Sequence, residues 1–246
     1  MPDPVADQGI DASPIESTPI VLVPGLTCSA RLYAAQIPAL WRFGPVTVAD
    51  HTRDDSMAAI ARRILATAPP RFALAGLSMG GYICFEIMRQ AAGRVTRLAL
   101  LDTGARADTP EQTERRHALT AMTRAGRYAE IPDLAFPVYV HRRRRDDAAL
   151  HLLVRTMAEE TGAEAYLRKQ QAILSRPDSR SLLSAIACPT LVLVGDGDVA
   201  TPPELAREMA ADIPGSRLVI IADSGHLSTL EQPAAVTTAL EEWTRW

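Results

Sequence analysis

The chain has 246 residues, of which 47% are hydrophobic, and a formal net charge of -3. This length and composition suffice for one large domain with a sizeable core. The slightly acidic balance argues against a nucleic-acid partner.

The N-terminal residues 1–17 are rich in Pro, Ser and Asp and have neither the basic nor the apolar region of a secretory signal. We therefore predict a poorly ordered leader over residues 1–17. No apolar run approaches the roughly 18 residues that cross a membrane, so we expect a cytoplasmic protein with no membrane partner. The three cysteines fit no disulfide framework and no zinc spacing, which favours a reducing compartment and no metal. They are Cys28, Cys84 and Cys188.

In chain order, six short runs follow that are mostly continuous in apolar residues. Such runs are typical of parallel strands covered on both faces. The predicted strands are Pro19–Pro24, Pro45–Asp50, Arg71–Leu77, Val95–Asp102, Thr190–Gly195 and Arg217–Ala222.

Helical patterns alternate with these strands. The predicted helices are Ser56–Ala66, Met79–Ala91, Pro202–Ala211 and Pro233–Trp243. Ser56 is the predicted N-cap of the first helix, and Thr201 is that of the third because Thr201 to Glu204 has capping-box spacing. This alternation predicts an α/β fold with a mostly parallel, doubly wound sheet.

Residues 104–187 interrupt the alternation, because they show helical periodicity and many charges but no convincing strand. We predict a helical cap over residues 104–187, inserted between the two parts of the core, residues 18–103 and 188–246. Its helices are expected in Glu111–Ala125, near Asp147–Glu160 and in Glu164–Leu174.

The third predicted strand runs directly into Gly76-Leu77-Ser78-Met79-Gly80, a G-x-S-x-G pattern before a predicted helix. In so sharp a turn, side chains two residues before and after the serine would collide, so both positions are glycine. The turn exposes the hydroxyl of Ser78 at the carboxyl edge of the sheet and at a helix N-terminus, which favours negative charge. This pattern predicts a nucleophile elbow with Ser78 as the nucleophile.

A serine nucleophile needs a base and an acid that orients the base. His226 follows the last strand in a glycine-containing loop and is the predicted base. Asp198 follows the fifth strand and is the predicted acid, with Asp102 and Asp196 as alternatives. The remaining histidines are expected to be structural: His51, His117, His141 and His151. Of these, His51 follows the second strand and could line the site.

The oxyanion of an acyl-transfer intermediate needs two backbone N–H donors. We expect these at Met79, directly after the nucleophile, and at Leu26 in the loop after the first strand, where Thr27 could add a hydroxyl contact. The most apolar stretch of the predicted cap, Ile131–Tyr139, either lines an acyl pocket or packs the cap onto the sheet. Its candidate substrate contacts are Leu134, Phe136 and Tyr139.

Four motifs, in this order, resemble those of the α/β-hydrolase superfamily: VLVPGL, GLSMGG, LVLVGDGDVATP and DSGHLSTLEQP. The resemblance covers residues 19–246. It implies the α/β-hydrolase fold with a helical cap, and the roles given above for Ser78, Asp198, His226, Leu26 and Met79, with no cofactor. A serine nucleophile argues against the dehalogenase and epoxide-hydrolase relatives, which use aspartate.

Two departures from the family pattern leave the subfamily and the substrate open. Pro24-Gly25 stands where many members have His-Gly, and the segment Asp50–Asp54 lacks the common R-G-x-G-x-S pattern. No arginine or lysine occupies a motif position that would bind a substrate carboxylate. We therefore expect an uncharged or weakly polar ester with a short or medium acyl chain, and polymeric aliphatic esters if the cleft is open.

Other functions use the same triad: thioesterase, lactonase, C–C bond hydrolase and acyltransferase. A small-molecule receptor on the same fold is a non-enzymatic alternative. The stretch Gly195–Ala200 also matches a G-x-G-x-x-A dinucleotide-binding pattern. Two features disfavour that alternative. The two aspartates of the stretch add negative charge where a pyrophosphate would bind, and the following Pro202 and Pro203 remove N–H donors there. The sequence does not address the oligomeric state.

Overall fold

The computed structural model describes residues 17–246, so the predicted leader lies, apart from Ser17, outside the described residues. Six strands form one sheet in the order β2-β1-β3-β4-β5-β6, and all the pairings are parallel. The strands are β1 (Ile20–Val23), β2 (Val46–Val48), β3 (Phe72–Leu77), β4 (Val95–Leu101), β5 (Thr190–Gly195) and β6 (Arg217–Ile221). All six predicted strands are confirmed, most of them one to three residues shorter than predicted.

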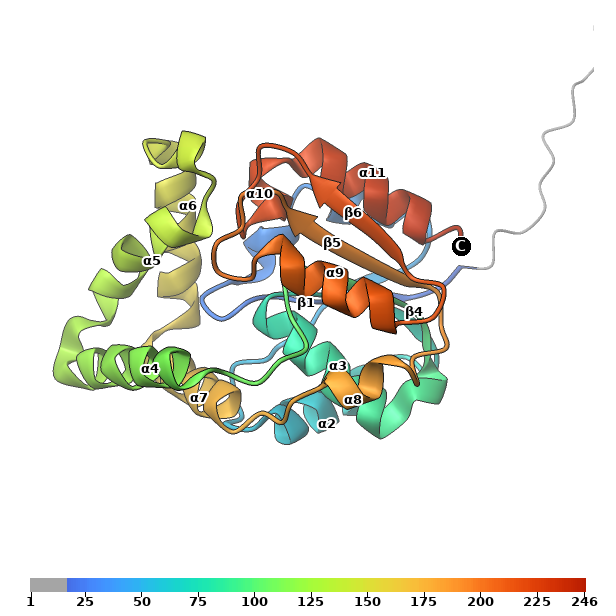
Figure 1. Ribbon diagram of the computed structural model, residues 1–246, viewed down its shortest axis with the longest axis horizontal. Helices are drawn as coiled ribbons and strands as arrows, with labels where there is room; N and C mark the ends of the chain where they lie inside the picture. The colour runs from blue at the N-terminus through green and yellow to red at the C-terminus, as the bar shows by residue number, and fades with distance from the viewer. Residues whose placement is uncertain (1–16) are drawn as a thin grey trace, which may run out of the picture.

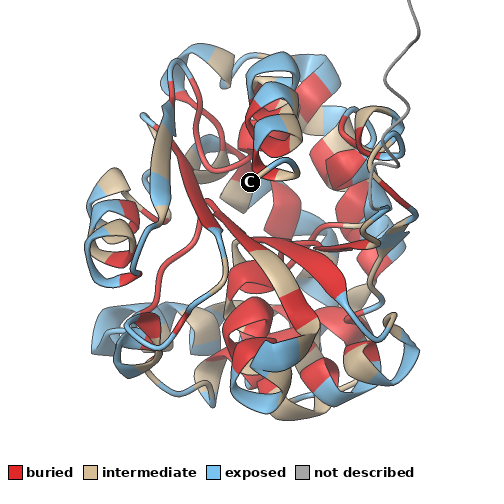
Figure 2. Cartoon of the chain, turned by 90° about the vertical axis from the view of Figure 1, so that its right-hand side faces the viewer, coloured by how far each residue is buried: buried red, intermediate tan, exposed pale blue. Residues whose placement is uncertain are grey.

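Helices cover both faces of the sheet, which confirms the doubly wound architecture (Figures 1 and 2). Strand side chains alternate between two buried clusters, because successive residues of a strand point to opposite faces. One face is covered by α2 (Met57–Thr67), α3 (Met79–Ala91), α8 (Arg180–Leu183) and α9 (Pro203–Asp212). The other is covered by a short turn at Ala30–Tyr33, α1 (Ile37–Leu40) and α11 (Pro233–Trp243).

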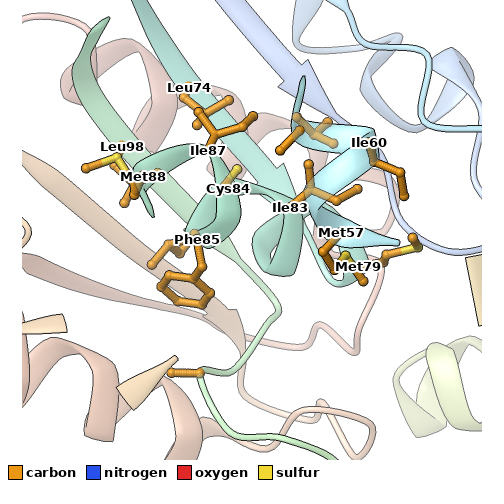
Figure 3. Close-up of a cluster of buried hydrophobic side chains, with 14 of the residues drawn as sticks. Met57, Ile60, Leu74, Met79, Ile83, Cys84, Phe85, Ile87, Met88 and Leu98 are labelled. Atoms are coloured by element: carbon orange, nitrogen blue, oxygen red, sulfur yellow. The ribbon is translucent and has the colours of Figure 1, made fainter. Parts of the chain in front are cut away.

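Helix α3 begins directly after Ser78 and is anchored along its length. Its buried apolar residues recur at helical spacing and pack against Leu74 of β3 and Ile60 of α2 (Figure 3). Ile83 and Ile87 belong to this cluster, which also contains Met79 at the first turn of the helix. The position of the helix start is therefore fixed by core packing.

The segment between β4 and β5 contains helices and no described strand. Four of its helices lie beside the sheet core, at the edge toward which the strand arrows point (Figure 1). The division of the chain into core and cap at residues 104 and 187 remains a prediction, and α8 already packs in the same buried cluster as α9. The four helices are α4 (Pro110–Met122), α5 (Ile131–Tyr139), α6 (Ala148–Thr161) and α7 (Ala163–Leu174).

Two N-cap predictions had different outcomes. Ser56 caps α2, since its side chain accepts a hydrogen bond from the amide of Ala59. The prediction for Thr201 is wrong: α9 begins at Pro203 with Pro202 in the capping position and no side-chain cap. None of the helices within residues 17–246 is long and apolar enough to cross a bilayer.

Candidate active site

The loops that follow four of the strands meet at one edge of the sheet. Because all paired strands are parallel, their carboxyl ends lie on the same side. The order of the strands reverses at β1, which pairs with both β2 and β3, so the loops after β1 and β3 diverge and leave a crevice between them. These loops carry Leu26 and Ser78, while the loops after β5 and β6 carry Asp198 and His226.

Ser78 stands alone between β3, which ends at Leu77, and α3, which begins at Met79. Its φ of 57° and ψ of -117° lie outside the regions that non-glycine residues prefer. Such backbone strain costs about 1–3 kcal/mol and persists only where the surrounding structure enforces it. The strained conformation predicted for the serine is therefore present, and its side chain is half-buried at the sheet edge.

The glycines on either side of Ser78 are required by close backbone contacts. A Cβ on Gly76 would lie 2.4 Å from the backbone of Gly80. A Cβ on Gly80 would lie 2.0 Å from the carbonyl oxygen of Val23. Only the contact at Gly76 matches the predicted collision around the turn. Gly80 is needed for another reason, because β1 lies against the start of α3.

A continuous chain of hydrogen bonds joins the serine, the histidine and one aspartate. The hydroxyl oxygen of Ser78 lies 2.8 Å from Nε2 of His226, and Nδ1 of His226 lies 2.8 Å from Oδ2 of Asp198. The side chains of His226 and Asp198 are 4% and 0% exposed, respectively. With the ring proton on Nδ1, the imidazole donates to the carboxylate and accepts from the serine hydroxyl.

Asp198 is held by three further hydrogen bonds. Its Oδ1 accepts from the amides of Ala200 and Thr201, at 2.8 and 2.9 Å. The hydroxyl of Thr201 donates to Oδ2 at 2.7 Å and lies 3.1 Å from Nδ1 of His226. The sequence pattern predicts a helix cap at Thr201, but in the structure its hydroxyl contacts both the aspartate and the histidine.

The two alternative acids do not contact the imidazole. Asp196 is exposed, and its Oδ1 accepts from the amide of Ser224. Asp102 is buried and bonds the amide of Gly195 and the hydroxyl of Ser228. Burial, and next the nearby charge of Asp198, raise the pKa of Asp102 above its ordinary value.

The electrostatics of His226 suit a base that is stabilised when it takes up a proton. Burial by itself lowers the pKa of the imidazole, but the charge and hydrogen bond of Asp198 outweigh burial, and the pKa is raised. An imidazolium at this position would be stabilised by the aspartate in a site with little water. The arrangement therefore favours proton transfer from the serine hydroxyl to Nε2.

The loop that carries His226 is fixed from two sides. The buried carboxylate of Glu231 accepts from the amides of Gly225, at 2.8 Å, and of His141, at 2.7 Å. The carbonyl of Tyr139, at the end of α5, accepts from the amide of His226 at 2.8 Å, and the two rings are 5.2 Å apart. The imidazole is thus positioned partly by the segment inserted between β4 and β5.

Two backbone amides point to an oxyanion site. Leu26 and Met79 both line the small cavity beside Ser78, and within residues 17–246 neither amide donates to a protein acceptor. The loop that carries Leu26 is held by two buried side chains. Nζ of Lys169 donates to the carbonyl of Leu26 at 2.9 Å, and Nε2 of His51 donates to that of Gly25 at 2.9 Å.

Lys169 and His51 are further functional candidates. No sequence motif singles out Lys169, and His51 is expected from the sequence to be structural. Burial lowers the pKa of Lys169 to about 7, and burial together with the Lys169 charge lowers that of His51 to about 3. His51 is therefore neutral, with its ring proton on Nε2, the nitrogen that donates to Gly25. The sequence does contain one indication that Lys169 is unusual, because it is the only lysine in a chain with 26 basic residues.

The cavity beside Ser78 has a volume of about 70 Å³ and adjoins an outer cavity of about 200 Å³. Of the predicted substrate contacts, Tyr139 lines both cavities, and Thr27 and Leu134 line the outer one. Phe136 lines neither, because its buried ring stacks on His151 at 4.4 Å. A residue that no motif indicated, Arg116 of α4, lines both.

The described residues leave little room for the dinucleotide alternative. Asp198 already occupies the amides of Ala200 and Thr201, which a pyrophosphate at this turn would need. The ring of His141 also packs against Gly197, where an added Cβ would lie 2.3 Å from it. Within residues 17–246 no group of three or more His, Cys, Asp or Glu side chains could hold a metal ion.

Known proteins resemble this chain in sequence and in fold. A family model described as the alpha/beta hydrolase family matches residues 20–239. Among solved structures, a thermophilic esterase from Thermogutta terrifontis is 33% identical with a TM-score of 0.85, covering 93% of this chain and 89% of that one. The enol-lactonase of Burkholderia xenovorans is 25% identical with a TM-score of 0.82, covering 94% and 92%.

A curated relative carries a different name. A Mycobacterium tuberculosis protein, provisionally named as the non-heme bromoperoxidase BpoC, is 31% identical over 191 residues, which are 70% of this chain and 67% of the relative. These relatives are named for three different reactions, so similarity alone does not fix a substrate.

Proposed function

The chain belongs to the α/β-hydrolase family, and we propose that within this family it is a carboxylic ester hydrolase that forms an acyl-enzyme on Ser78. The observation that carries the proposal is the hydrogen-bond chain from Ser78 through His226 to Asp198. The Ser78 end of this chain lies beside two amides, those of Leu26 and Met79, which have no acceptor within residues 17–246.

Each group has one task in the proposed reaction. The oxygen of Ser78 attacks the ester carbonyl carbon while its proton moves to Nε2 of His226. The amides of Leu26 and Met79 stabilise the oxyanion. Collapse of the tetrahedral intermediate breaks the bond to the leaving alcohol, which takes the proton from His226. Water then attacks the acyl-enzyme, gives its proton to His226 and releases the acid, and Ser78 regains its proton.

The cavities support short or medium substituents. The volumes of about 70 and 200 Å³ are small for ligand sites, which commonly measure about 300–1,000 Å³. They favour a small ester over a polymeric one. The named activities of the Thermogutta esterase and the Burkholderia enol-lactonase both concern acyl–oxygen bonds, which favours an ester or a cyclic ester over a C–C substrate.

The test is turnover of 4-nitrophenyl esters from acetate to octanoate by the wild type and by Ser78→Ala. We expect activity on the shorter esters and a loss of roughly 10⁴-fold or more in the variant. Ser175→Ala is the matched control, because Ser175 is exposed and lies away from both cavities. Activity that survives in Ser78→Ala, or a wild type that cleaves no ester, would overturn the proposal.

A further inference from the structure

Arg116 brings a positive charge to the wall of the site. It lies in α4 and lines both the cavity beside Ser78 and the outer cavity. Its side chain is 20% exposed. Nε donates to Asp108 at 2.5 Å, Nη1 donates to Gln170 at 3.1 Å, and Nη2 reaches Asp108 at 3.5 Å. A guanidinium has five N–H donors, so these contacts leave one N–H on each terminal nitrogen for another partner.

The acid beside Arg116 does not balance the local charge. Asp108 is shared with Arg176, whose Nη2 lies 2.9 Å from its Oδ1. Burial by itself would raise the pKa of Asp108, but the bonds to Arg176 and Arg116 lower it, so the carboxylate is charged. One carboxylate between two guanidinium groups leaves a net positive charge beside the cavities.

The outer cavity adds a second guanidinium. Arg115 lines it, is exposed, and has no ion-pair partner within residues 17–246. No Asp or Glu lines either cavity. The remaining polar groups of the two walls are neutral donors and acceptors or the triad itself: Thr27, Ser78, Tyr82, Gln112, Tyr139, Tyr166, Gln170, Thr201 and His226. An anionic ligand would therefore meet cations and no competing carboxylate.

We propose that the substrate is an ester that also carries a carboxylate, with the scissile carbonyl at Ser78 and the carboxylate at Arg116. Arg115 lies farther out and would contact longer substrates. The proposal rests on the proposed function, and it replaces the uncharged ester that the absence of a motif arginine had suggested. Guanidinium groups bind carboxylates through paired N–H donors, and the two N–H groups left on Arg116 match that requirement.

Two esters of one acid test the proposal. Methyl hydrogen glutarate and dimethyl glutarate have the same acyl chain and the same scissile group, and differ in the charge at the far end. We expect wild-type kcat/KM, measured by methanol release, to be roughly tenfold or more higher for the monoester. Monomethyl succinate and adipate then locate the best distance between carboxylate and carbonyl.

Substitutions separate charge recognition from folding. Arg116→Gln should lower kcat/KM for the monoester by roughly tenfold or more, mostly through KM, and lower that for the diester by much less. Because Arg116 also contacts Asp108 and Gln170, Arg115→Gln is the second variant, with a smaller loss in the same direction. Arg124→Gln is the control, since Arg124 is exposed and lines neither cavity.

The outcomes distinguish this inference from the proposed function. A wild type that cleaves both esters equally, or an Arg116→Gln variant that loses both equally, would overturn the carboxylate site and leave ester hydrolysis intact. Cleavage of the 4-nitrophenyl esters but of neither glutarate ester would also overturn the carboxylate site. Cleavage of none of these esters, or cleavage that persists in Ser78→Ala, would instead overturn the proposed function. The monoester preference should also fall as ionic strength rises, because salt screens the attraction.

Discussion

The two sides of the site differ in how their groups are held. On the sheet side, the proposed reacting groups follow strand ends and are fixed by the backbone, through the positive φ of Ser78 and the amides that bond Asp198. On the other side, helices α4 and α7 contribute single long side chains, those of Arg116 and Lys169, which reach in from helix surfaces.

We relate this difference to function: the sheet side carries the groups proposed to react, and the helical side carries groups proposed to bind the substrate or position a loop. A strand-end loop can place an atom only with a particular backbone shape, and that shape demands particular residues nearby in sequence. A helix surface accepts many side chains at each position. We therefore expect changes on the sheet side to remove the reaction or the fold, and changes on the helical side to alter substrate choice or rate by less.

The largest effect is expected from Asp198→Asn, which should lower kcat by roughly 10³- to 10⁴-fold because the imidazole loses its orienting charge. The pH profile gives a second readout. His226 must be neutral to act as a base, so activity falls as pH drops through its pKa, which Asp198 raises. Removing that charge lowers the pKa, and the acid limb of residual kcat/KM should move to lower pH.

Two controls make the Asp198 test specific. Asp196→Asn should keep the rate and the pH profile, because Asp196 is exposed and does not contact His226. Asp102→Asn tests the other alternative acid. A larger loss at either of these positions than at Asp198 would show that the acid has been misassigned.

Gly76→Ala should destabilise the fold, because its Cβ would lie 2.4 Å from the Gly80 backbone. Overpacking of this kind costs about 1–3 kcal/mol, which corresponds to a Tm lower by about 2–12 °C for a domain of this size. Gly93→Ala is the matched control, since a Cβ there meets nothing within 4 Å. Equal Tm values for the two variants would contradict the close-contact explanation.

Lys169→Met should have the smallest effect on rate among these changes. It removes the hydrogen bond to the Leu26 carbonyl but leaves the amide in the loop. We expect kcat to fall roughly three- to tenfold with little change in KM, well below the about 100-fold cost of losing an oxyanion donor. A change confined to KM would contradict a role in positioning the loop.

Lys169 also predicts a pH dependence of stability. Its pKa is about 7 in the folded protein and near the ordinary 10.5 when unfolded, so between these values the unfolded chain binds more protons. The free energy of unfolding should therefore rise with pH from about 7 to 10.5, and Lys169→Met should lack that contribution. Because Lys169 is the only lysine, NMR of ¹³C-labelled lysine would report its pKa directly, and a value near 10.5 would contradict the burial argument.

The sequence determined the sheet and the place of the proposed reacting groups. Strands buried on both faces leave continuous apolar runs, and the turn at Ser78 demands Gly76. Those local requirements also located His226, and they ranked Asp198 above Asp196 and Asp102. They misread Thr201, because a hydroxyl before a helix has the same sequence pattern whether it caps the helix or bonds a carboxylate.

Only the tertiary structure decided what surrounds those groups. Lys169 lies 143 residues from the carbonyl it bonds, and Arg116 lies in a charged helix whose orientation no local pattern specifies. Phe136 was expected at the substrate, but its ring faces His151, because helix packing selects which face of α5 is buried. Groups fixed by the backbone leave a local signature in the sequence, whereas side chains brought in by helix packing leave none.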